Sequence, residues 1–150
     1  MKTIFSILLL ICIAGLGCKE SQKQIDVPAP VLAKYKSQYP DVKKVTWEME
    51  DGRYEAAFEG QSGEMAVQYS TDGMLVLTET EIEISALPKT VTDYFNQNKP
   101  GKKLSDPEKI VTADGAITFE VEVDNTDYLF DSAGNYTGME KEESEEKEED

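Results

Sequence analysis

Two short stretches of the chain carry apolar residues at helical spacing, and each starts just after a proline. Proline is tolerated in the first helical turn because the N–H group that it lacks has no partner inside the helix there. Pro40 and Pro100 follow the two stretches and would end a helix before them. We therefore predict helices over Val31–Tyr39 and Val91–Phe95. Their apolar stripes are Val31, Leu32, Tyr35 and Tyr39 in the first helix and Val91, Tyr94 and Phe95 in the second.

After each stretch, apolar and polar residues alternate, which is typical of strands with one buried face. The turn pairs Asp51-Gly52 and Asp72-Gly73 divide the first alternating region into antiparallel strands. A helix with one apolar stripe and strands with one apolar face bury each other, so we expect the helices to cover the apolar side. The apolar strand positions are Tyr54, Ala56, Phe58, Met65, Val67, Tyr69, Leu75 and Leu77, and then Ile117, Phe119, Val121, Val123, Tyr128 and Phe130.

The chain repeats this pattern. Val27-Pro28 matches Leu87-Pro88 at an offset of 60 residues, and Pro40 matches Pro100 at the same offset. The predicted fold class is α+β: a tandem repeat of a helix plus antiparallel strands. We expect the two units to join into one continuous antiparallel sheet with both helices on one face.

The first residues have the layout of an export signal. Lys2 precedes an apolar run that is too short for a transmembrane helix, and small residues precede Cys18. Gly15-Leu16-Gly17-Cys18 resembles a bacterial lipobox, although its leucine lies one place later than in the usual pattern. We predict cleavage before Cys18 and acylation of this residue. The alternative is ordinary signal-peptidase cleavage, which would leave Cys18 as a free thiol.

Charge limits the partners. The net charge is −15, and Met139–Asp150 alone holds eight carboxylates and two lysines. So strong an anion repels phosphate groups, which excludes nucleic acid and leaves the lipid anchor as the only expected membrane contact. The tail has too few apolar residues to offset the entropy of ordering, so we predict disorder, with a frayed helix as the alternative. The predicted segments are a signal peptide 1–17, a polar linker 18–26, a domain 27–138 (repeats 27–84 and 85–138) and an acidic tail 139–150.

The residue types that most catalytic and metal sites need are scarce. The chain has no histidine, and its other cysteine, Cys12, lies inside the signal segment. This composition excludes Ser-His-Asp and Cys-His nucleophile systems and the usual zinc ligand sets. Ser62 lies in an expected turn, and Asp124–Asp127 lacks the spacing of a calcium loop and is predicted to be a polar hairpin loop. We predict no catalytic residue, no metal, no cofactor and no enzymatic activity.

The order of these motifs resembles the PepSY-like family of β-lactamase-inhibitor-like domains, which are secreted proteins or lipoproteins of Bacteroidota. The resemblance implies a fold like that of the β-lactamase inhibitory protein, whose open sheet face grips a partner protein. It covers roughly Val27 to Met139 and depends on motif order, since no single motif is specific. The motifs are Val27-Pro28, Val31, Tyr39-Pro40, Val45, Trp47, Tyr54–Phe58, Tyr69-Ser70, Asp72-Gly73, Leu87-Pro88, Val91, Tyr128, Phe130-Asp131 and Gly134.

The candidate partner-binding face is the sheet side opposite the helices, represented by Glu55, Glu59, Glu120 and Glu122. A broad acidic platform suits a protein partner, whereas small molecules prefer concave apolar pockets. The alternative is that these glutamates only keep this side of the sheet hydrated and bind no partner. We interpret the chain as an exported, envelope-associated binding module that could act as an inhibitor. The second hypothesis is an accessory or structural lipoprotein that modulates a neighbouring envelope assembly or protease. The expected location is the periplasm or an anchor in the outer membrane, with the cell surface as a further option.

Overall fold

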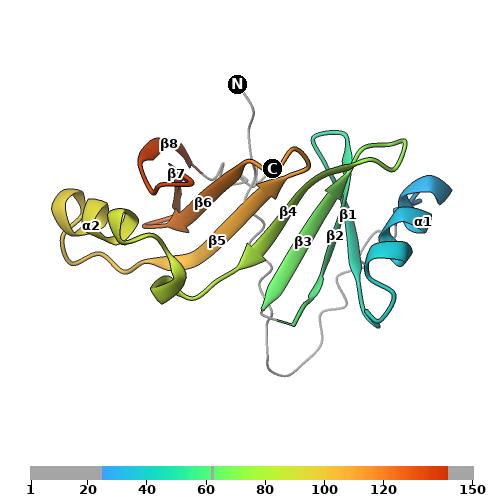
Figure 1. Ribbon diagram of the computed structural model, residues 1–150, viewed down its shortest axis with the longest axis horizontal. Helices are drawn as coiled ribbons and strands as arrows, with labels where there is room; N and C mark the ends of the chain where they lie inside the picture. Colours follow the sequence, from blue (N-terminus) through green and yellow to red (C-terminus); the bar gives the residue numbers. More distant parts are fainter. Residues whose placement is uncertain (1–24, 62, 142–150) are drawn as a thin grey trace, which may run out of the picture.

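The computed structural model describes residues 25–61 and 63–141, and its strands form one antiparallel sheet in the order β1 to β8 (Figure 1). The predicted signal segment, Cys18 and residues 142–150 of the predicted tail lie outside the described residues. The elements are α1 (Ala29–Gln38), β1 (Thr46–Glu50), β2 (Arg53–Glu59), β3 (Glu64–Tyr69), β4 (Leu75–Glu81), a 3-10 turn (Ile84–Ala86), α2 (Lys89–Asn98), β5 (Ser105–Thr112), β6 (Ile117–Glu122), β7 (Thr126–Asp131) and β8 (Tyr136–Lys141).

The predicted fold class is confirmed. One helix followed by four antiparallel strands occurs twice along the chain, and both sets of strands belong to the same sheet. Whether the two halves arose from one duplicated unit stays a prediction. Each helix begins directly after its proline, Pro28 or Pro88. Helix α1 ends at Gln38, one residue before the predicted end at Tyr39, and α2 is twice as long as the predicted Val91–Phe95. In the described part of the chain, neither helix has the length and apolar character needed to cross a membrane.

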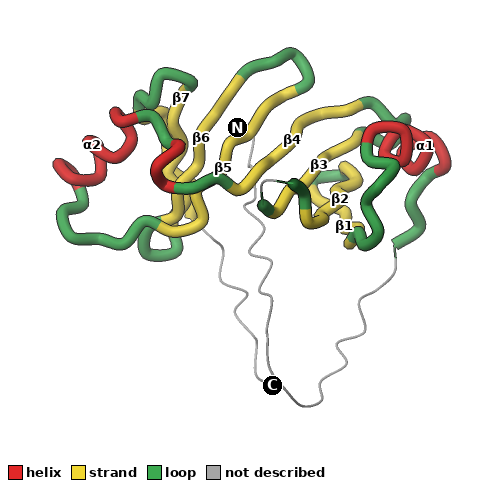
Figure 2. Tube along the Cα trace, turned by 60° about the horizontal axis from the view of Figure 1, so that its bottom comes forward, coloured by secondary structure: helices red, strands yellow, loops and turns green. Residues whose placement is uncertain are grey.

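Both helices lie on one side of the sheet, and the strand register shows this. Residues paired directly across antiparallel strands point to the same face. Val67 packs in the core under α1 and pairs with Thr78, which pairs with Val111. Val111 pairs with Ile117, which packs against the core under α2. Figure 2 shows α1 and α2 at opposite ends of the twisted sheet.

Two separate cores result, and the aromatic residues fill them. Tyr35 of α1 contacts Trp47 and Phe58 edge to face, with ring centroids 5.1 Å and 5.6 Å away. Phe95 of α2 contacts Tyr128 and Phe130 in the same way, at 5.3 Å and 5.5 Å. The predicted apolar strand face is therefore confirmed at its central positions. These are Tyr54, Ala56, Phe58, Val67 and Tyr69 under α1, and Phe119, Val121, Val123, Tyr128 and Phe130 under α2.

Two hairpins close with two-residue turns of the mirror-image type. Asp51 and Gly52 have φ values of 47° and 75°, as the Asp-Gly pair predicts. Asp124 and Asn125 have φ values of 54° and 56° and make the equivalent turn between β6 and β7. The predicted polar loop is thus shorter than expected, because Asp127 belongs to β7 and is buried.

Two glycine turns fix the helix starts against the sheet. Gly73, with a φ of 85°, follows β3, and a β-carbon there would come within 2.8 Å of the Pro30 backbone. Gly134, with a φ of 80°, follows β7 and leaves room for the Thr90 hydroxyl, which donates a 2.7 Å hydrogen bond to the Ala133 carbonyl. A side chain at either glycine would be strained and would push the helix away. Each helix is therefore placed by the turn before the last strand of its own half.

Three expectations need correction. A bulge between β3 and β4 puts Leu77 opposite Gln68, so Leu77 lies on the face away from the helices while Leu75 packs under α1. Strand β5, interrupted by Pro107, was not predicted. Finally, β8 runs to Lys141, so the first three residues of the predicted tail pair with β7 and the domain boundary at residue 138 falls inside a strand.

Candidate partner-binding surface

The sheet side opposite α1 and α2, which we call the helix-free face, is dominated by carboxyl groups. Successive strand residues point to opposite sides, so every second position of each strand belongs to it. Arg53 is the basic residue among the strand positions that the register places there. The acidic positions are Glu48 and Glu50 on β1, Glu55 and Glu59 on β2, Glu64 on β3, Glu79 and Glu81 on β4, Glu108 on β5, Glu120 and Glu122 on β6, Asp127 and Asp131 on β7, and Glu140 on β8.

The four sequence-predicted residues all lie on the helix-free face, but only part of them meets solvent. Glu59 is exposed and Glu122 is half-buried. Glu55 and Glu120 are each only 1% exposed, so the expectation of a uniformly wet acidic platform is wrong at these two positions. Their role in binding a partner stays a proposal.

The amide of Gln68 organises the first half of this face. Its Nε2 donates hydrogen bonds to Glu50 Oε2 at 2.9 Å and to Glu55 Oε2 at 3.0 Å, while its Oε1 accepts one from Arg53 Nη1 at 3.2 Å. Burial, followed by a hydrogen bond with Glu55, raises the pKa of Glu50 to about 8, as expected for two carboxyls that share a proton. Burial also raises the pKa of Glu55.

The central strands carry a second pair. Glu79 is 4% exposed, and its Oε1 has no hydrogen-bond partner among the described residues. Burial, followed by the charge of Glu108, raises the pKa of Glu79 to about 9. Burial, followed by the charge of Glu120, raises the pKa of Glu108 to about 8. At neutral pH these carboxyls hold their protons, so the centre of the helix-free face is less negative than its composition suggests.

The acidic groups act on one another across the sheet. Glu55 on β2 contributes to the raised pKa of Glu108 on β5, although in a flat sheet three strand spacings separate them by roughly 14 Å. The acidic groups of this face are therefore electrostatically coupled from β2 to β5. Within residues 25–61 and 63–141, no group of three acidic or cysteine residues is placed to hold a metal ion. We call Glu50, Glu55, Glu79 and Glu108 the carboxyl cluster.

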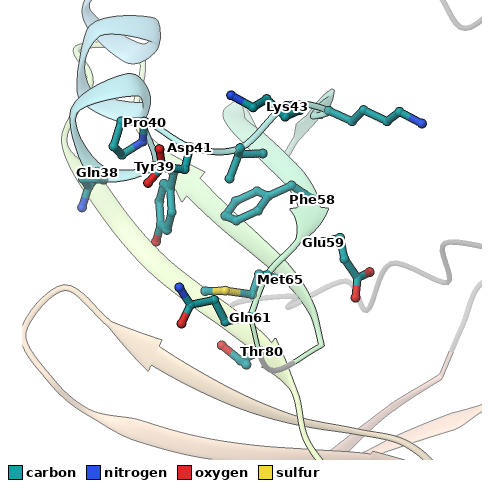
Figure 3. A pocket seen from close by; sticks show the side chains of 13 residues that line it. Gln38, Tyr39, Pro40, Asp41, Lys43, Phe58, Glu59, Gln61, Met65 and Thr80 are labelled. Atoms are coloured by element: carbon teal, nitrogen blue, oxygen red, sulfur yellow. The ribbon is translucent and has the colours of Figure 1, made fainter.

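A cleft of about 870 Å³ opens on the other side of the sheet, at the C-terminal end of α1 (Figure 3). Tyr39 and Phe58, with ring centroids 4.7 Å apart, and Met65 form its apolar wall. Lys43 and Glu59 also line it, so the charges along it do not favour one sign. Its size suits a small molecule, but none of the described residues that line it is both polar and buried.

No protein-family model matches the chain, and no curated protein matches it. Solved structures do. A candidate periplasmic protein from Bacteroides eggerthii has a TM-score of 0.69 at 17% identity, over 77% of this chain and 88% of that chain. A DUF2874 family protein from Bacteroides ovatus has a TM-score of 0.65 at 21% identity, over 78% and 89%. A BLIP-like protein from Bacteroides fragilis has a TM-score of 0.63 at 20% identity, over 79% and 88%.

The chain has a BLIP-like fold. Identities this low show the fold alone, so the site must be argued from the residues themselves. In this BLIP-like sheet both helices cover one side, and the helix-free face spans all eight strands.

Sequence reasoning missed three members of the site. The alternation of β3 does not single out Gln68, because the sequence around one amide does not show which side chains it contacts in the fold. Glu79 was missed because the bulge at Val76 shifts the alternation of β4 by one residue. Glu108 was missed with the whole of β5, whose proline argued against a strand. The density of glutamates at every second position was the one signal available.

Proposed function

We propose that this chain is an exported, lipid-anchored binding module that takes a protein partner on the helix-free face of its sheet. The observation that carries the proposal is the asymmetry of the sheet: both helices and nearly all aromatic residues pack on the same side of it. A broad face without a helix matches the area that protein interfaces need. Small molecules prefer concave apolar pockets, and the large cleft that described residues line opens on the other side of the sheet.

The exposed margin of the face supplies the electrostatic guidance. Glu48, Glu59 and Glu81 are exposed on three different strands, around the protonated centre. Such a negative margin speeds association with a basic partner and makes the on-rate fall as salt rises. It contributes less to the final affinity. Inhibition of the partner is the narrower form of this proposal, and it rests on the fold likeness to the BLIP-like protein alone.

Export and anchoring belong to the same proposal. The order of Lys2, apolar run and Cys18 supports them, and the candidate periplasmic protein of the same fold fits an envelope location. Intact-mass analysis of membrane-extracted protein tests the anchor: we expect acyl chains on a chain beginning at Cys18. An unmodified mass, or a Cys18→Ala variant released like its parent, would contradict anchoring without touching the binding face.

Site-specific photo-crosslinking tests the binding face directly. A photoreactive amino acid placed at Glu59 or Glu122 should give an adduct with an envelope protein, whereas the same group at Lys34 or Lys89 on the helices should not. Because adducts can arise by random collision, the decisive step is competition. The adduct should weaken when Glu48 and Glu81 are changed to lysine, which reverses the charge of the margin.

A matched variant controls for net charge. Glu83→Lys with Asp41→Lys makes the same charge change at exposed residues outside the strands and should leave the adduct intact. Equal loss in both double variants would mean that overall charge, and not this face, governs capture. Adducts from Lys34 and Lys89 alone would move the site to the helices and contradict the proposal.

A further inference from the structure

The carboxyl groups of the helix-free face outnumber its basic strand residues, and they differ in how deeply they are buried. Glu48, Glu59 and Glu81 are exposed, Glu50 and Glu108 are half-buried, and Glu55 and Glu79 are buried. The strand register places further titratable groups on the same face as the cluster: Glu48 on β1, Arg53 and Glu59 on β2, Glu64 on β3, Glu81 on β4, Glu120 and Glu122 on β6, Asp127 and Asp131 on β7, and Glu140 on β8. The charge of Asp51, in the turn after β1, acts on Glu50, and the charge of Asp106 on β5 acts on Glu108.

Two buried oxygens in this cluster accept no hydrogen bond from any described residue. They are Glu55 Oε1 and Glu79 Oε1, on residues that are 1% and 4% exposed. A buried carboxyl oxygen without a donor is costly, so this arrangement leaves acceptor capacity unused. Arg53, the basic side chain of the same face, donates to the amide of Gln68. The cluster therefore has room for positive charge that the strand residues of this face do not supply.

At neutral pH, bound protons neutralise carboxyl groups of the cluster, as a cation beside them could also do. Burial and the charges of neighbouring carboxylates raise the pKa of Glu50 and of Glu108 to about 8, so these two carboxyls hold protons at neutral pH. These two carboxyls are also the members that still reach solvent. An ammonium or guanidinium group arriving beside either one would favour its charged form and lower its pKa. The buried Glu79 would respond in turn, because the charge of Glu108 acts on it.

We propose that the helix-free face receives lysine or arginine side chains of the partner at Glu50 and Glu108, and that each such contact exchanges a proton for the cation. The carboxyl proton passes to solvent, the partner's ammonium or guanidinium keeps its own protons, and an ion pair replaces the neutral acid. This inference rests on the proposed function and names the chemistry of the partner: a basic segment that is extended enough to touch β1 and β5 together. Binding is then tightest at alkaline pH and weakens as the pH falls.

Calorimetry with a hexalysine peptide tests the exchange, using the purified full-length protein in a non-ionic detergent. Titration at pH 7 in two buffers of different ionisation enthalpy counts the protons released. We expect about one proton or more per bound peptide, and an affinity that rises roughly tenfold per pH unit between pH 6 and pH 8 for each proton released. Glu108→Gln keeps the shape of the protonated acid but cannot ionise, so it should lose the share of the release and of the pH dependence that Glu108 contributes. Glu50→Gln combined with Glu108→Gln should lose most of both.

Glu81→Gln is the matched control, because Glu81 pairs directly with Glu108, shares its face and is exposed. It should lower the affinity slightly and leave proton release unchanged. Peptide binding without proton release, or equal effects of the two variants, would overturn the exchange. No binding of the peptide would also overturn it, while crosslinking at Glu59 would still decide the proposed function separately. Proton release by calcium chloride but not by the peptide would replace the proposal with a metal site.

Discussion

The two faces of this sheet are both substantially buried, and they are buried for opposite reasons. On the helix-covered face, Tyr35 of α1 and Phe95 of α2 pack against aromatic strand residues. Burial of these apolar side chains stabilises the fold. On the helix-free face, Glu55 and Glu79 are as inaccessible as core residues, yet burial works against their charged forms. The first face explains why the chain folds. The second holds chemistry that folding alone does not require.

The difference shows that alternation predicts which side a residue points to but not what surrounds it there. Phe58 and Glu59 are neighbours on β2 and point to opposite sides, as expected. Glu55 and Glu59 share one side, yet one is buried and the other exposed. Glu55 lies within β2 and pairs with a residue on each neighbouring strand, whereas Glu59 is the last residue of β2. Depth on the helix-free face is therefore a property of the whole sheet.

The largest expected effect comes from the helix-covered face. Phe119→Ala should cost about 3–5 kcal/mol of unfolding free energy, because it removes a ring buried among Val121, Phe130 and their neighbours. Urea denaturation followed by circular dichroism measures this loss. Met49→Ala is the control, since Met49 points to the same face at the sheet edge but is 54% exposed. A Phe119 variant as stable as its parent would mean that the two faces have been exchanged.

The next effect belongs to the carboxyl cluster and depends on pH. The raised pKa of about 9 for Glu79 and about 8 for Glu108 means that the folded state keeps protons that the unfolded state, titrating near 4.5, gives up. This contribution to stability is complete below pH 4.5 and is lost as the pH rises through 8 and 9. We expect the free energy of unfolding to fall by several kcal/mol between pH 5 and pH 9, since each unit of raised pKa corresponds to about 1.4 kcal/mol for each group.

Glu79→Gln sharpens this test. The amide imitates the protonated acid, so the variant should nearly match its parent at pH 5 and be more stable than the parent by several kcal/mol at pH 9. The single tryptophan, Trp47, packs under α1 and gives a fluorescence signal for the denaturation curves. Stability that rises from pH 5 to pH 9 in the parent would show that the cluster is ionised in the fold.

A smaller effect is expected at the last strand. Removal of Met139 and all following residues should lower stability by about 1–2 kcal/mol, because Met139 and Glu140 pair with β7. Removal of residues 142–150 alone should leave the thermal midpoint nearly unchanged if they form the disordered tail that their composition predicts. Thermal denaturation of both truncated chains decides this. Equal midpoints would mean that β8 adds nothing to the sheet.

The smallest effect should come from the margin. Glu59→Gln on the helix-free face should change stability by less than about 0.5 kcal/mol, since its side chain is exposed. The same urea curves measure it. A cost comparable with that of a core truncation would show that the margin is packed and that the contrast between centre and margin is wrong.

Local sequence patterns were sufficient to predict most of the fold but few of the residues of the candidate site. The prolines before the helices, the Asp51-Gly52 turn and the alternation around Phe119 were sufficient to predict the elements and the covered face. The bulge that turns Leu77 away from the core was not visible, because a one-residue shift leaves no mark in composition. The site needed contacts between β2, β4 and β5, which only the assembled sheet provides.

The central claim is that the helix-free face holds protonated carboxyls at neutral pH, and an NMR titration of glutamate carboxyl carbons tests it most directly. The Glu79 signal can be assigned by its loss in Glu79→Gln. We predict a titration midpoint for Glu79 well above pH 7 and near the value of about 9 that its burial implies. A Glu79 signal that titrates below pH 6, together with those of Glu50 and Glu108, would show that the cluster is charged and would contradict the account.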